Sequence, residues 1–127
     1  MAIEKYLNLS ISRTKFCHRQ LATFFHMHAD PQLEGRFEKA DRRCLREYAY
    51  HLLKAGDAEA FSSLATNMCY LHAVSLHRLV FESCDYIHAA LGMLEPGSPK
   101  WVNLYTFYCF LMRQVYVLSI NKRLITL

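Results

Sequence analysis

Residues 42–57 have the sequence RRCLREYAYHLLKAGD, which contains a helix together with the signal that ends it. Its apolar side chains recur at the spacing of one helical face, at Leu45, Tyr48, Ala49, Leu52 and Leu53. Gly56 stands where this helix should stop, because glycine adopts the left-handed conformation without a Cβ clash. The stretch predicts one half of a helical hairpin.

The composition extends this prediction to the whole chain. Of its 127 residues, 53% are hydrophobic and 20% are charged, which predicts a single compact domain over residues 1–127. Only four Gly and three Pro are present, too few for the turns of an all-β fold. We expect an all-α fold of about five to six antiparallel helices stacked as hairpins, in an irregular bundle or a short solenoid.

The first quarter of the chain contains two predicted helical segments. Residues 2–7 are interpreted as the tail of one helix, although alternating apolar residues through Ile11 also suit a strand. Ser12 is a candidate N-cap for a second helix to about residue 28, which an Ala-Asp-Pro sequence ends. One stripe of this helix comprises Cys17, Leu21, Phe24 and His28, with Phe25 beside it.

Capping side chains mark the starts of later helices at Asp57, Thr66-Asn67 and Ser98-Pro99. Before them, a helix is expected from about Glu38 or Asp41 to Ala55, and the first of these caps starts a short helix. The cap at Thr66-Asn67 starts a long apolar helix over residues 68–94, which could bend at residues 82–83. The third opens a last helix that ends at about residue 120.

Four short parts of the chain resemble one protein family, in the family's order. They are RRCLREYAYHLLKAG at 42–56, YL at 6–7 with FCHRQLATFF at 16–25, YLHA at 70–73 with DY at 85–86, and FYCFL at 107–111 with VLS at 117–119. They are similar to the helical region that follows the nucleotide-binding core in NACHT-type signal-transduction ATPases. That family includes the telomerase-associated vault protein and the nephrocystins.

The resemblance implies a connecting role. In that family the helical region lies between the ATPase core and a repeat domain, and it braces their relative position. The glycine-rich loop that holds nucleotide phosphates is absent here, because Gly35, Gly56, Gly92 and Gly97 are isolated from one another. We therefore expect a non-catalytic scaffold, either a fragment or a subunit of a larger assembly.

The sequence contains no pattern that carries catalysis. It has no HExxH helix, no nucleophile elbow and no carboxylate-rich calcium loop, so we expect neither enzymatic activity nor a cofactor. Cys84 and His88, four residues apart on one helical face, leave a small metal site as an alternative. His51 is interpreted as a packing residue whose ring nitrogen bonds to a carbonyl of a neighbouring helix.

The last helix is the candidate interaction surface. Apolar residues occupy more than one of its faces, and a domain of this size cannot easily cover them all. The residues expected to contact another subunit or domain are Trp101, Tyr105, Tyr108, Leu111, Met112 and Val115. A membrane span is not expected, because Asn103, Arg113 and Gln114 interrupt the apolar run.

A basic RNA-binding subunit is the main alternative to a scaffold. The net charge is +4 at pH 7, and Arg42, Arg43 and Arg46 form a local cluster suited to phosphate or acidic contacts. No zinc-finger, winged-helix or aromatic-sheet motif accompanies this cluster. We therefore favour a solvated helix face.

The cysteines and the N-terminal residues indicate the cellular compartment of the chain. The five cysteines are scattered and form no CxxC pair, which favours reduced thiols over a disulfide framework. The first residues lack the charged start and apolar run of a secretory signal. We expect an intracellular chain, cytoplasmic or cytoskeletal, that is not secreted.

Overall fold

The computed structural model describes residues 2–126, apart from the side chains at positions 118, 119 and 122–126. Within this range the chain forms six helices and no strand: α1 (Ala2–Ala29), α2 (Arg42–Lys54), α3 (Ala58–Ala65), α4 (Met68–Leu76), α5 (Val80–Leu91) and α6 (Pro99–Thr126). The all-α fold expected from composition and periodicity is confirmed.

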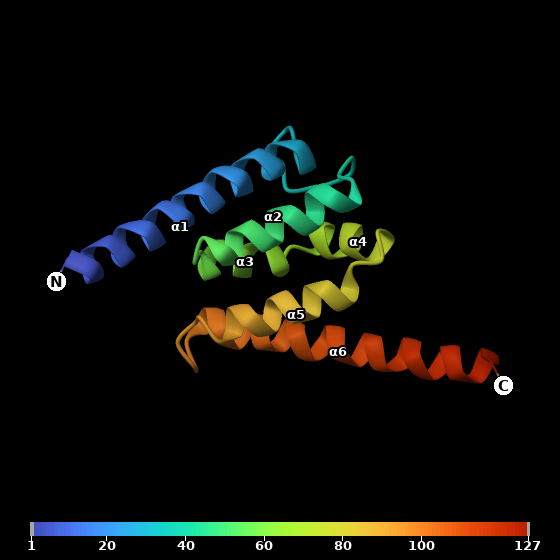
Figure 1. The fold of residues 1–127 in the computed structure, drawn as a ribbon. Coiled ribbons are helices and arrows are strands. Elements are labelled where there is room, and N and C mark those ends of the chain that lie inside the picture. Colours follow the sequence, from blue (N-terminus) through green and yellow to red (C-terminus); the bar gives the residue numbers. More distant parts are fainter. Residues whose placement is uncertain (1, 127) are drawn as a thin grey trace.

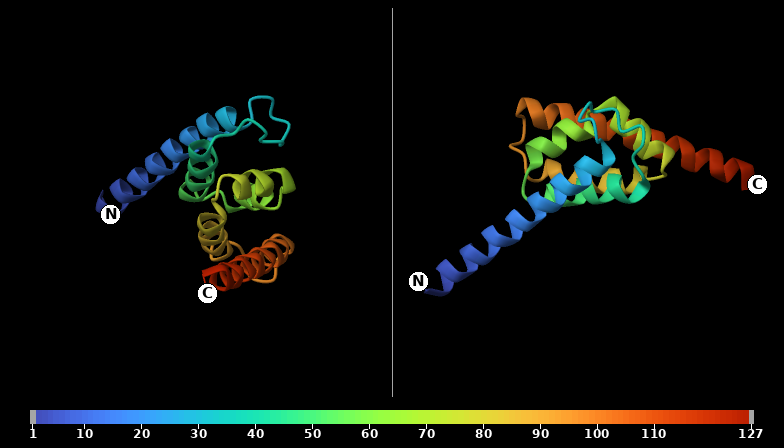
Figure 2. Two further views of the ribbon diagram at one scale, coloured as in Figure 1. Left: turned by 90° about the vertical axis from the view of Figure 1, so that its right-hand side faces the viewer. Right: turned by 90° about the horizontal axis from the view of Figure 1, so that it is seen from above.

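The helices form a layered stack (Figure 1). α1 packs on α2 at one end and α6 packs on α5 at the other, with α3 and α4 in the middle. Within residues 2–126, α2 is the only helix that α1 contacts, whereas α6 contacts α3 as well as α5. The start of α1 and the end of α6 extend beyond the stack on opposite sides (Figures 1 and 2). The two longest helices are therefore the two ends of the stack.

The core lies between the end helices. Its most deeply buried large side chains come from every part of the chain after α1: Leu45, Phe61, Val74, Leu79, Ile87 and Leu104. α1 contributes the smaller set Ala22, Phe25 and Ala29. The centre of the stack is thus built by α2 to α6, and α1 is attached to its edge.

The caps expected at Asp57, Asn67 and Ser98 are confirmed. The Asp57 carboxylate accepts the backbone N–H of Ala60 at 3.1 Å, at the start of α3. The Asn67 side chain accepts the N–H of Cys69 at 2.8 Å, at the start of α4. The Ser98 hydroxyl accepts the N–H of Trp101 at 3.3 Å, where α6 begins. Each cap satisfies a backbone donor that has no partner inside its helix.

The expected single helix over residues 68–94 is wrong, because the chain breaks between α4 and α5. Arg78 adopts the left-handed conformation with φ of +58°. The N–H of Leu79 then bonds to the carbonyl of Val74 at 2.9 Å, which closes a Schellman motif, and Leu79 enters the core. The sequence gives little warning of this break, since an arginine occupies the position that normally favours glycine.

The N-terminal segment also differs from expectation. α1 is one continuous helix, whereas the sequence suggested a helix tail followed by a new helix capped by Ser12. Polar side chains inside α1 bond back to the helix instead of capping it, as Thr14 does to the carbonyl of Ser10 at 2.9 Å. At the other end of the chain, α6 continues to Thr126 rather than stopping near residue 120.

The ends of α2 and α4 provide a matched pair for mutation. Gly56 has φ of +77° and occupies the same Schellman position as Arg78. We expect Gly56→Ala to lower the free energy of unfolding by about 1 kcal/mol, because a Cβ is disfavoured at positive φ. We expect Arg78→Gly to raise it by about 0.5 kcal/mol, since glycine removes that strain but makes the unfolded chain more flexible. Urea unfolding measures the free energy of unfolding of both variants. If the two variants change it in the same direction, Gly56 and Arg78 do not occupy equivalent helix-ending positions.

Candidate functional site

The structure divides the six residues expected at the α6 interface. Leu111 is only 8% exposed and belongs to the core, so its predicted place on an exposed surface is wrong. Tyr108 and Val115 are half-buried against the same core. Tyr105 and Met112 are exposed, at 46% and 42%. The half-buried Trp101 stacks on Tyr105, with ring centroids 5.0 Å apart.

The exposed apolar face of α6 is a stripe that includes residues the sequence analysis did not single out. The α6 outer stripe comprises Val102, Tyr105, Cys109, Met112, Tyr116 and Ile120, and the exposed side chains of Phe110 and Val117 widen this apolar face on one side. It lies on a different side of the helix from Leu104 and Leu111, the buried residues that face the stack. Its regular spacing is visible in the sequence, but α6 is apolar on several faces, so the sequence did not show which face is free.

A second apolar stripe runs along α1. The α1 outer stripe comprises Ile3, Tyr6, Leu9, Phe16, Leu21, Phe24 and Met27, which are between 41% and 76% exposed. Leu21 and Phe24 belong to the stripe that the sequence analysis recognised, whereas Ala22 and Ala29 face α2. Ala22 and Ala29 allow α1 and α2 to approach closely, and the buried Phe25 packs against His51 of α2.

A chain of polar side chains joins α1 to α2. His18 Nδ1 on α1 lies 2.8 Å from His51 Nδ1 on α2, and His51 Nε2 lies 3.3 Å from the carboxylate of Glu47. Phe25 stacks on the His51 ring at 5.7 Å. His51 is therefore a packing residue, but its partner is a second imidazole rather than the carbonyl that we expected. A bond between two Nδ1 atoms requires one donor and one acceptor.

This requirement means that only one of the two Nδ1 atoms carries hydrogen while the bond is intact. If both Nδ1 atoms carry hydrogen, the bond is lost, and if both rings are fully protonated two positive charges also face each other. Burial is the main cause that lowers the pKa of His51; the Glu47 carboxylate opposes it, and His18 lowers the pKa further. The geometry thus favours a neutral His51 in the folded chain.

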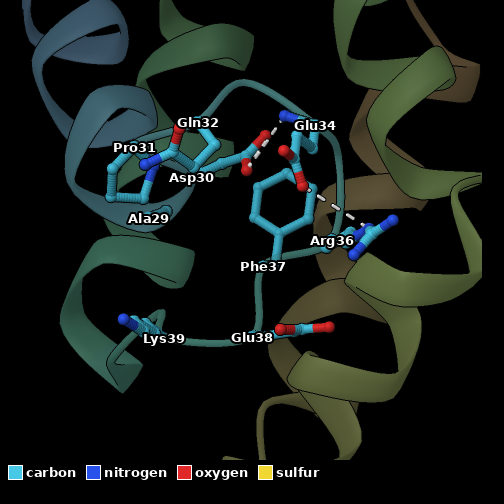
Figure 3. Close-up of a pocket in the computed structure, with 9 residues that line it drawn as sticks. All are labelled: Ala29, Asp30, Pro31, Gln32, Glu34, Arg36, Phe37, Glu38 and Lys39. Atoms are coloured by element: carbon cyan, nitrogen blue, oxygen red, sulfur yellow. Dashed lines mark hydrogen bonds and ion pairs between the residues drawn. The ribbon is translucent and has the colours of Figure 1, made fainter.

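A small pocket of about 170 Å³ lies beside the loop between α1 and α2 (Figure 3). Asp30, at its edge, is 5% exposed and accepts the backbone N–H groups of Gly35 at 2.7 Å and Glu34 at 3.3 Å. Arg36 lies 3.5 Å from the Glu34 carboxylate. Because the buried carboxylate is already bonded to loop amides, its role is to shape this loop, and we assign no ligand to the pocket.

The basic cluster on α2 is partly neutralised by carboxylates. Arg42 lies 3.5 Å from Glu82 and also donates to the carbonyl of His77 at 3.3 Å. Arg46 lies 3.6 Å from Glu47. Arg43 is exposed. These ion pairs reduce the positive charge that the cluster presents to a phosphate.

The metal alternative lacks a complete ligand set in the described part of the chain. No three His, Cys, Asp or Glu side chains there come together as a metal site. Cys84 is buried, which raises the pKa of its thiol and disfavours the thiolate that binds metals. His88 is exposed, with its ring 6.1 Å from that of Tyr108.

No family model, curated protein or solved structure matches this chain. The resemblance to NACHT-type ATPases therefore stays a prediction from the four quoted parts of the sequence. None of the helices within residues 2–126 has both the length and the hydropathy to cross a membrane.

The lowered pKa of His51 predicts a dependence of stability on pH. The unfolded residue titrates near 6.5, and the folded one below that, so the unfolded chain binds more protons in this range. The free energy of unfolding should fall as pH drops from about 6.5 toward the folded pKa. His51→Phe should weaken this dependence, as followed by urea unfolding between about pH 5.5 and 7.5. His72→Phe, at an exposed site on α4, is the control and should keep the wild-type dependence.

Proposed function

We propose that the chain is a non-catalytic helical connector that holds one protein neighbour on each end of its stack. The observation that supports this proposal most directly is the presence of an outer apolar stripe on both terminal helices. Isolated exposed apolar residues are ordinary on protein surfaces, but continuous apolar stripes indicate interaction sites. The two stripes belong to helices at opposite ends of the stack (Figure 1).

The size of the exposed side chains makes each stripe a useful docking surface. Complete burial of a Leu, Phe or Met side chain contributes about 1.5–3 kcal/mol. Phe16, Phe24 and Met27 of α1 are each more than half exposed, so a helix packed on them would bury much of this area. Tyr105 and Tyr116 of α6 offer aromatic surface with a polar hydroxyl, a type of residue enriched in protein interfaces.

The resemblance to NACHT-type ATPases supports the same function. In that family the helical region has a neighbour on each side, the ATPase core and the repeat domain. A stack with an apolar stripe on each terminal helix suits a position between two such neighbours. Partners in a separate complex would use the same two surfaces if this chain acts as a subunit.

The proposed function predicts that the α6 outer stripe is dispensable for folding. Tyr105→Ser with Met112→Ser should change the free energy of unfolding by less than about 1 kcal/mol, because both side chains are exposed. Leu111→Ala should lower it by about 2–5 kcal/mol, because it leaves a cavity in the core. The double variant should also lose the proteins recovered with the tagged chain by affinity purification and mass spectrometry.

Asn103→Ser is the matched control for this experiment, since Asn103 is exposed on α6 but lies outside the stripe. It should retain both the stability and the recovered proteins. If the double variant unfolds as readily as Leu111→Ala, the stripe is part of the fold and the connector proposal fails at this end.

A further inference from the structure

The attachment of α1 is separate from the contacts that hold the rest of the stack. Within residues 2–126, α1 contacts α2 and no other helix (Figure 1). The loop that follows α1 has contacts of its own with α4. Phe37 is 4% exposed and its ring meets that of Tyr70, and Asn67 donates to the carbonyl of Gly35 at 3.0 Å. α1 can therefore leave α2 without breaking these contacts.

The hydrogen bond between His18 and His51 allows one arrangement of hydrogens while both rings are neutral. The Glu47 carboxylate only accepts, so His51 Nε2, 3.3 Å from it, carries hydrogen. A neutral imidazole has hydrogen on one nitrogen, so His51 Nδ1 accepts from His18 Nδ1 at 2.8 Å. His18 can gain a proton at Nε2 and keep this bond. A proton on His51 Nδ1 breaks it.

The two rings meet head-on. Their centroids are 5.0 Å apart while the two Nδ1 atoms are 2.8 Å apart, so each nitrogen points at the other. A metal ion between them, with bonds of about 2.0–2.1 Å, would require the nitrogens to be about 4 Å apart in this arrangement. The space holds one hydrogen. A second hydrogen on this line would force the helices apart.

The surroundings of His51 leave it no substitute for the lost bond. The residue is 8% exposed, and Phe25 of α1 stacks on its ring at 5.7 Å. Water therefore cannot accept the new N–H group while α1 stays in place, and a buried donor without a partner is costly. Departure of α1 exposes His51 Nδ1 to solvent.

Six titratable or charged side chains surround the imidazole pair: Lys15 of α1, Arg46, Glu47, Tyr50 and Lys54 of α2, and Tyr86 of α5. Among them, Glu47 favours a second proton on His51, and it also pairs with Arg46 at 3.6 Å. Lys54 lies 5.7 Å from the Tyr50 ring. Burial raises the pKa of Tyr86, so this phenol stays neutral at acidic pH. One carboxylate thus opposes the effect of burial.

We infer that the imidazole pair makes the attachment of α1 sensitive to protons: a proton on His51 Nδ1 at mildly acidic pH releases α1 from α2, while α2 to α6 stay folded. This inference goes beyond the connector function and does not depend on it. Release would uncover Phe25 of α1 and Tyr48 of α2, on which His26 stacks at 4.5 Å. New apolar surface would therefore appear at acidic pH.

The direction of the pH effect follows from the two states of His51. Burial lowers the pKa of the docked residue below its ordinary value near 6.5, and release removes that burial. The released state therefore binds more protons than the docked state. The docked state is favoured above about pH 6.5 and becomes less favoured as the pH falls below it.

Hydrogen exchange followed by mass spectrometry tests the inference on the full chain at pH 7.5 and 5.5, with exposure times scaled for the intrinsic exchange rate. Amides of residues 16–29 should lose about five- to tenfold in protection at pH 5.5, because each proton bound on opening changes the equilibrium by at most about tenfold per pH unit. Peptides from α3 and α5 should change by less than about twofold.

His18→Gln should keep α1 protected at pH 5.5. The glutamine amide can turn over and present either an N–H group or a carbonyl to His51 Nδ1, so it accommodates both protonation states. His28→Gln is the matched control on the same helix. His28 is exposed and bonds to the carbonyl of Phe24 in α1, so this variant should lose protection as the wild type does.

Imidazole ¹⁵N NMR of the wild type provides a second measurement that needs no substitution. At pH 7.5 the His51 hydrogen should be on Nε2 and the His18 hydrogen on Nδ1. His51 should gain its second proton over the same pH range in which α1 loses protection. If His51 gains that proton while α1 stays protected, the inference is wrong.

Three exchange results would also overturn the inference. Protection of α1 that persists at pH 5.5 would show that α1 is not released. Equal loss of protection in all helices would show that α1 does not open as a separate unit. A His18→Gln variant that is docked at pH 7.5 and still releases α1 at pH 5.5 would assign the effect to another group.

Discussion

The one-sided packing of the terminal helices is the constraint on which the rest of the structure depends. α1 rests on α2 alone within the described residues, and α6 rests on α5 and α3. The deeply buried core is built by the helices after α1, around Leu45, Phe61 and Ile87. Each long end helix therefore buries one face, and its other apolar face remains exposed. The outer stripes follow from this geometry.

The attachment of α1 combines small apolar residues with titratable ones. Ala22, Phe25 and Ala29 supply the apolar contact, and His18 and His51 supply the polar contact. Alanines allow the helices to approach closely but contribute little buried area. Ring contacts add to this interface: Phe25 stacks on His51 at 5.7 Å, and His26 stacks on Tyr48 at 4.5 Å. Because burial lowers the pKa of His51, the stability of the α1 attachment should depend on the protonation of this residue.

Local signals in the sequence predicted most helix ends correctly. Asp57, Asn67 and Ser98 act as caps, and Gly56 ends α2, because each effect depends on one residue and its nearest backbone groups. Local signals did not predict the break after α4. There Arg78 is held at positive φ while Leu79 is buried, and that burial involves helices distant in the sequence. The continuity of α1 was not predicted either, because a serine such as Ser12 favours a helix start but is tolerated inside a helix at a small cost.

The sequence by itself determined the fold class, the apolar periodicity and the local capping, since these depend on residues a few positions apart. Only the tertiary structure decided which face of α6 is free. α6 is apolar on several sides, so its periodicity does not distinguish Leu111 from Met112; packing against α5 and α3 buries the first and leaves the second exposed. The same holds for Arg42, whose charge is offset by Glu82 of α5, and for His51, whose partner is on α1. Such pairings join residues far apart in the chain, and the packing of the helices brings them together.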